Sequence, residues 1–315
     1  MQRTKTITDS LLTIIATRPE PHSFGCPKRL RRLHRRYLKR AISPHQNATR
    51  TYRSVIVLMV SAVWAVAATA QVLDPVFIED LTWPELRDTI RAGKTTVILP
   101  VGGTEQNGPQ MVIGKHNFII RHTSEQIARR LGNALVAPVI AYVPEGNLDP
   151  PTSHMRYPGT ITLPHEYFLK LIEYAARSFK LHGFKDIVFI GDHGSYQDDL
   201  RTVADQLSPE WNGTGVRVHF IPQYYSGNGF TDWLESKGIT KREIGSHASI
   251  TDTSQLLALD PNYIRMDKLA EGTPENGILG DPRRANAEIG KRGLEFKIEA
   301  AVQQIRQAVA RSQAK

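Results

Sequence analysis

The sequence predicts an α/β domain with a mostly parallel sheet and helices on both of its faces. Two observations predict this fold class. Between residues 71 and 315, strand-like apolar runs alternate with helical patterns, and this alternation is typical of parallel sheets built from βαβ units. The same region, about 245 residues long, is large enough to bury one sizeable core.

The first half of this region predicts two strands and two helices. Residues 95–101 are an apolar strand-like run, and a helix near 117–131 is closed by a glycine. Residues 134–143 predict a second strand, interrupted by a proline. The next helix begins at Pro164, because proline is favoured at the first helical position. Its apolar residues recur at helical spacing: Phe168, Leu171, Ile172, Ala175 and Phe179.

The second half repeats the alternation. Residues 186–190 form a short β-branched run, and residues 195–207 follow with a helical pattern. Residues 216–221 predict another strand. A long helical pattern then runs from about residue 284 to residue 313. The order of these elements places several turns at the carboxyl ends of strands, where α/β folds build their sites.

Two of these turns contain side chains that could bind a metal. Directly after the strand at 95–101, a Gly-rich loop holds Glu105 and is followed by His116. After the strand at 186–190, His193 stands between glycines. A capped turn or a structural histidine would explain either loop alone. Two such loops on one sheet can converge on one crevice, and carboxylate with imidazole suits a divalent metal.

Five segments stand in order between about residues 78 and 310. They are Pro100–Gln110 with Gly114–His116, Ser153–Thr162, Gly191–Tyr196, His247–Ser254 and Gly280–Pro282. Together they resemble the signatures of the creatininase (creatinine amidohydrolase) family. The resemblance implies a creatininase-like three-layer sandwich. It also implies a homo-oligomer, with a hexamer as one candidate, and a small-molecule substrate.

The resemblance implies a role for each matching residue. Glu105, His116 and His193 would hold the metal, and His247 or Asp252 would carry a proton to the leaving nitrogen. Three further residues would lie in the substrate pocket or beside the metal ligands: Asn107, His154 and Ser195. Turn capping for His154, and a helix N-terminal acid for Asp252, are the structural alternatives.

Four positions depart from the family pattern. Asn107 stands where the family has a metal-binding His, and His116 replaces an Asp shared between two metals. Ser195 replaces a Glu of creatininase itself, and Asp252 replaces another Glu. Because a bridging position needs a carboxylate, we expect one divalent metal, with zinc as the first choice ahead of manganese or iron.

The resemblance thus implies a metal-dependent hydrolase that acts on a cyclic amide or another non-peptide C–N bond. The replaced ligands leave an alternative open, namely a catalytically inactive, exported small-molecule-binding protein on the same fold. Metal analysis and a screen of lactams and cyclic ureas distinguish the two.

The first seventy residues differ from this domain. Residues 1–53 hold 13 Lys and Arg against two acidic residues, a net charge of +11, whereas the whole chain carries +9. With little apolar surface, this leader is expected to be disordered, or to result from a start codon placed too far upstream. Its charge could suggest nucleic acid or an anionic membrane. The apolar run that follows explains this charge better, as the basic flank of a signal peptide, so we expect no nucleic-acid partner.

Residues 54–70 form that apolar run, which ends in the small-x-small pattern Ala68-Thr69-Ala70. A basic flank, an apolar run and such a site are the layout of a secretory signal peptide. An uncleaved anchor is the alternative, although the run is shorter than the roughly 20 residues of a membrane span. We therefore expect a periplasmic or secreted protein that begins near Gln71 and keeps no membrane anchor. The only cysteine, Cys26, lies in the leader, so any metal would have N and O ligands.

Overall fold

The computed structural model describes residues 75–313. The basic leader 1–53, the apolar run 54–70 and the predicted cleavage site lie outside the described residues. Residues 75–313 belong to one compact unit, Val72–Lys315. Within this range, no helix combines the length and the apolar character that crossing a membrane requires.

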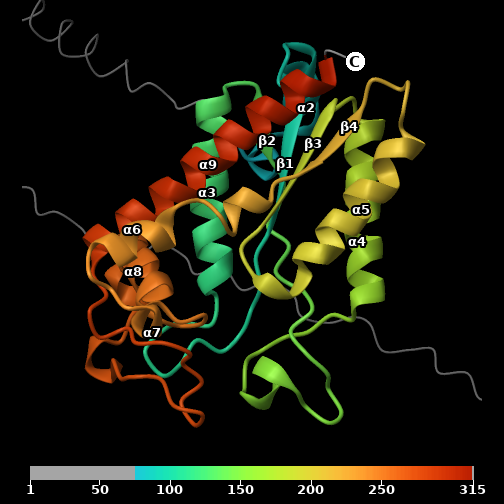
Figure 1. Cartoon of the computed structure of the whole chain (residues 1–315). Helices are drawn as coiled ribbons and strands as arrows, with labels where there is room; N and C mark the ends of the chain where they lie inside the picture. The colour runs from blue at the N-terminus through green and yellow to red at the C-terminus, as the bar shows by residue number, and fades with distance from the viewer. Residues whose placement is uncertain (1–74, 314–315) are drawn as a thin grey trace, which may run out of the picture. The chain divides into compact units, whose positions relative to one another are not determined.

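A four-stranded parallel sheet forms the centre of this unit (Figure 1). Its strands are β1 (Thr96–Val101), β2 (Ala134–Val136), β3 (Asp186–Gly191) and β4 (Arg217–Phe220), in the order β2-β1-β3-β4. The register pairs Thr96 with Asp186 and continues to Val101 with Gly191. Because β1 and β3 end side by side, the loops that follow them start from the same edge of the sheet.

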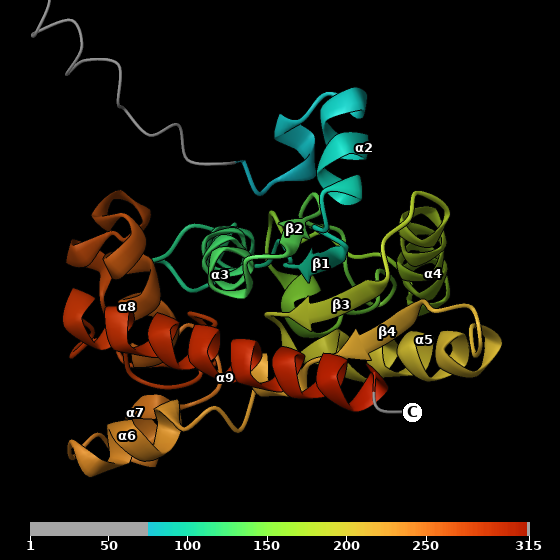
Figure 2. The same ribbon diagram turned by 90° about the horizontal axis from the view of Figure 1, so that it is seen from above.

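Helices cover both faces of the sheet (Figure 2). On one face lie α3 (Lys115–Leu131) and α9 (Ala287–Gln313), and on the other lie α4 (His165–Leu181) and α5 (Gln197–Glu210). Alternate residues of β1 face opposite ways. Leu99 packs with α4 and α5, whereas Ile98 packs with α3 and α9. Strands buried on both faces explain the continuous apolar runs, and the predicted α/β class with helices on both faces is confirmed.

Three further helices lie beside α9. They are α6 (Phe230–Ser236), α7 (Lys241–Ile244) and α8 (Ile250–Leu259), and α8 packs along α9 (Figure 1). A glycine allows this close approach, because a Cβ at Gly290 would overlap the Ser254 carbonyl of α8. Short 3₁₀ helices occupy Ile78–Asp80, Ser153–Arg156, Gly194–Tyr196, Pro222–Tyr224, Pro261–Tyr263 and Met266–Lys268.

The structure differs from the sequence expectations at three places. Strand β2 ends at Val136 instead of residue 143, and only single bridges continue the pairing, for example between Val101 and Ile140. Pro164 is the residue before the first turn of α4 and not its first helical position. Helix α2 (Trp83–Arg91) was not expected, although a capping box formed by Thr82 and Glu85 starts it.

Candidate metal centre

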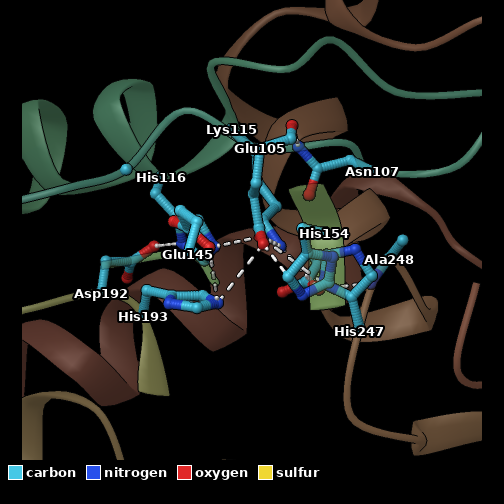
Figure 3. Close-up of polar contacts among 12 residues, drawn as sticks. Glu105, Asn107, Lys115, His116, Glu145, His154, Asp192, His193, His247 and Ala248 are labelled. Atoms are coloured by element: carbon cyan, nitrogen blue, oxygen red, sulfur yellow. Dashed lines mark hydrogen bonds and ion pairs between the residues drawn. The ribbon is translucent and has the colours of Figure 1, made fainter. Parts of the chain in front are cut away.

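Four ligand-type side chains meet where the sheet's strands end (Figure 3). Glu105 comes from the loop after β1, and His193 follows β3. Glu145 lies beyond β2, just after Val143, and His154 comes from the 3₁₀ helix Ser153–Arg156. One ligand atom of each residue lies within 4.8 Å of the others. We call these four residues the ligand group.

The carboxylates of the ligand group are buried and short of partners. Glu105 is fully buried, and Glu145 is 2% exposed. Oε2 of Glu105 and both oxygens of Glu145 have no hydrogen-bond partner among the described residues. Gly103, with φ of 152°, lets Glu145 approach, since a Cβ there would lie 2.9 Å from its Oε1. Buried carboxylates rarely stay unpaired, so this space suits a cation.

The electrostatics of the two carboxylates differ. Burial, together with the neighbouring Glu105 charge, raises the pKa of Glu145 to about 9. Burial would also raise the pKa of Glu105, but the nearby Lys115 ammonium and a hydrogen bond from His116 outweigh it and lower that pKa. The pair therefore shares one proton when no cation is present. A divalent ion would release it and satisfy all three unpartnered oxygens.

His193 presents a ring nitrogen to this space. The Ser195 backbone N–H donates to Nδ1 of His193 at 3.3 Å. The Ser195 hydroxyl oxygen lies 2.9 Å from the same nitrogen, and the hydroxyl donates to the Pro144 carbonyl. Nε2 of His193 lies 3.3 Å from Oε2 of Glu105. For Nε2 to bind a metal, the ring proton would sit on Nδ1, where the Ser195 oxygen can accept it.

His154 has a defined tautomer. The Gln106 side-chain amide donates to the Gly277 carbonyl and to Nδ1 of His154, each at 3.0 Å. The proton of neutral His154 therefore sits on Nε2, which lies 3.2 Å from Oε2 of Glu105. Burial lowers the pKa of His154, so the ring is neutral. Among the four residues, Glu105, Glu145 and His193 are suited to ligation, and His154 is suited to donating a hydrogen bond.

His116 lies next to the ligand group but is not part of it. Its Nε2 is 2.7 Å from Oε1 of Glu105, and its Nδ1 is 2.7 Å from Asp192. Burial would lower the pKa of His116, but the hydrogen bonds to the two carboxylates raise it. Both ring nitrogens are thus engaged. In this arrangement His116 orients Glu105, and its expected role as a metal ligand stays a prediction.

Asp252, expected as a proton carrier, is held by a buried lysine. Its Oδ2 accepts from Lys115 Nζ at 3.2 Å and from the Ala248 backbone N–H at 2.8 Å. Lys115 is 1% exposed and also lies 3.2 Å from Oε1 of Glu105. Burial would lower the pKa of Lys115, but Asp252 and Glu105 raise it. Asp252 therefore forms an ion pair in the wall of the site.

His247 and Asn107 border the Glu105 loop. Nε2 of His247 donates to the Gln106 carbonyl at 2.9 Å, and burial with the Lys115 charge lowers the pKa of His247 to about 3. Its ring centroid lies 4.3 Å from that of His154. The Asn107 amide donates to the Glu105 carbonyl at 2.9 Å, while its own oxygen is buried without a partner.

A cavity of about 570 Å³ opens beside the ligand group. It is lined by eight of the residues discussed above: Lys115, His116, His154, Asp192, His193, Ser195, His247 and Asp252. The structure therefore brings His154 and Ser195 to the pocket, whereas Asn107 is 1% exposed and does not line it. Glu145 and Lys115 were missed by sequence reasoning. Glu145 could have been found, because it follows the segment predicted as the second strand.

Comparisons with known proteins point to one family. Residues 79–305 match the family model for creatininase, described as creatinine amidohydrolase. The chain is 23% identical to the creatinine amidohydrolase of Pseudomonas putida over 256 residues, which span 74% of this chain and 96% of that protein. It is 27% identical to the mycofactocin precursor peptide peptidase of Mycolicibacterium smegmatis over 221 residues, which span 62% and 78%.

Solved structures show the same fold. A structure described as creatininase Mn superposes with a TM-score of 0.64 at 23% identity, covering 75% of this chain and 99% of that one.

Proposed function

The chain belongs to the creatininase family of metal-dependent amidohydrolases, and we propose that it hydrolyses a cyclic amide or another non-peptide C–N bond with one divalent ion. Zinc is the first choice, ahead of manganese or iron, because the group combines an imidazole with carboxylates. One observation carries the proposal. Three buried carboxylate oxygens without partners among the described residues lie in the same small group as a ring nitrogen of His193.

Glu105, Glu145 and His193 would hold the ion. When bound, a divalent ion supplies a Lewis acid that polarises the scissile carbonyl and makes a water more acidic. His116 keeps Oε1 of Glu105 occupied, so that Oε2 faces the ligand group. The Ser195 oxygen lies 2.9 Å from Nδ1 of His193 and could accept its proton when Nε2 binds the ion. These contacts preorganise the site before any substrate enters.

The histidines of the cavity wall would contact the substrate. His154 is neutral, and its protonated Nε2 lies 3.2 Å from Oε2 of Glu105, so this N–H can donate a hydrogen bond to the carbonyl oxygen of the substrate. The ring of His247 lies beside it, tilted by 40°, and stays neutral. Asp252 pairs with Lys115 in the wall of the site. Proton transfer to the leaving nitrogen by His247 or Asp252 stays a prediction.

Metal analysis and a substrate screen test this function. The purified protein should bind one equivalent of zinc and open at least one lactam or cyclic urea. His193→Ala should lose both the ion and the activity. His165→Ala is the matched control, because His165 is exposed and pairs only with Asp199 at the surface. A protein that binds a small molecule tightly without metal would instead favour the inactive binding protein.

We also propose that the protein is exported and oligomeric. The basic flank and the apolar run before Gln71 support export. Amino-terminal sequencing of the protein from its native cells should place the first residue near Gln71. A chain that keeps residues 1–50 would contradict export by this signal peptide. Light scattering should give a homo-oligomer, and a monomer at all concentrations would contradict that part.

A further inference from the structure

Lys115 is a buried cation that neither the ligand group nor the proposed proton transfer uses. It is the first residue of α3, and its side chain is 1% exposed. Lysine is almost never fully buried unless it is paired. Here the Nζ atom lies 3.2 Å from Oε1 of Glu105 and 3.2 Å from Oδ2 of Asp252. One ammonium therefore joins two carboxylates from distant parts of the chain.

We propose that the buried Lys115 ammonium occupies the place of a second metal ion and so limits the metal centre to one ion, an inference that rests on the proposed function. The two oxygens of Glu105 face different groups. Oε1 faces Lys115 and His116, whereas Oε2 faces His154 and His193 of the ligand group. The carboxylate thus bridges a fixed charge of the protein and the exchangeable ion.

A backbone hydrogen bond holds Asp252, the second carboxylate, beside the Lys115 ammonium. Ala248 has a left-handed φ of 52° although it is not glycine. This conformation is uncommon for a residue with a Cβ. It accompanies a hydrogen bond from its N–H to Oδ2 of Asp252 at 2.8 Å, the same oxygen that faces Lys115. The chain therefore fixes Asp252 against Lys115.

The other carboxylate near His116 is also neutralised by the protein. Asp192 lies 2.6 Å from Lys297 Nζ and 2.7 Å from Nδ1 of His116. Its burial matches that of Glu105, with 3% of its surface exposed. Of the carboxylates around Glu105, only Glu145 lacks a partner among the described residues. Outside the ligand group, a second divalent ion would meet only occupied carboxylates and a repelling ammonium.

The test is metal titration of the purified full-length protein by calorimetry with zinc and with manganese, checked by elemental analysis. Lys115→Met removes the charge and keeps the volume. It should either bind a second equivalent or bind the first at least about tenfold more tightly, because a repelling charge is removed. Lys115→Gln carries the same expectation if the methionine variant does not fold. Lys297→Met is the matched control, since it also removes a buried ammonium, but one paired with Asp192.

The outcomes separate this inference from the proposed function. One equivalent in the natural protein, a gain in either Lys115 variant and no gain in Lys297→Met support the inference. Unchanged stoichiometry and affinity in both Lys115 variants overturn it, as does an equal gain in the Lys297 variant or two equivalents in the natural protein. A natural protein that binds no metal would instead defeat the proposed function.

Discussion

Glu145→Gln should remove a pH dependence from the stability of the metal-free protein. Glu145 is 2% exposed, and burial beside Glu105 raises its pKa to about 9, against an ordinary value of 4.5. The folded state therefore binds a proton that the unfolded state releases. This contribution to stability is complete below pH 4.5 and is lost as the pH rises towards 9.

The size of the effect follows from linkage. Between pH 6 and 8, which lies inside the window set by the two pKa values, the folded state holds about one extra proton. Each pH unit then costs the natural protein about 1.4 kcal/mol of unfolding free energy, or about 3 kcal/mol over this range. Glutamine has the same shape and no titration, so the variant lacks this slope.

Urea unfolding in the presence of a chelator measures the effect. Both proteins are unfolded at pH 6, 7 and 8, and the difference between their unfolding free energies is compared. The other titrating groups contribute to both proteins and largely cancel in this comparison. The natural protein should lose stability relative to the variant as the pH rises. Parallel pH dependences would show that the pKa of Glu145 is not raised in the metal-free protein, which would contradict its burial beside Glu105 without a compensating partner.

Four further variants test separate contacts. His154→Ala should keep the bound ion and lower kcat by about 10² to 10³ in steady-state assays, because a hydrogen-bond donor to the carbonyl oxygen is lost; loss of the ion would make His154 a ligand. His116→Asn should keep one equivalent but weaken zinc binding by about 10 to 100-fold in calorimetry, whereas a metal-free variant would restore it as a ligand. Ser195→Ala should weaken zinc binding by a similar factor, because the acceptor for the Nδ1 proton of His193 is lost, and an unchanged Kd would show that this contact does not support the ligand. Gly290→Ala should lower the unfolding free energy by about 1 to 3 kcal/mol in urea titrations. An unchanged midpoint would show that the packing of α8 against α9 accommodates the added methyl group without cost.

Most of the fold could be predicted because its signals are local. Strands β1 and β3 are apolar runs, and the apolar stripe of α4 has helical spacing. Strand β2 is shorter than expected because its pairing with β1 beyond Val136 is reduced to a single bridge at Ile140. Helix α2 has a proline and a capping box at its start, but none of its residues is buried, so its pattern carries little core signal.

The site could be predicted only in part, because spacing does not show where a ring nitrogen points. The loops with Glu105 and His193 follow from strand order. The role of His116 depends on Asp192, which approaches it from another strand end 76 residues later. Lys115 could not be foreseen, since lysine at a helix start is usually solvated and only the fold brings Asp252 to it.

An anomalous difference map at the zinc edge, from crystals of the zinc-loaded protein, tests the central claim most directly. The account predicts one peak per chain, bonded to carboxylate oxygens of Glu105 and Glu145 and to Nε2 of His193, with the Lys115 ammonium on the other side of Glu105. A peak bonded to His116, or two peaks in one chain, would contradict it.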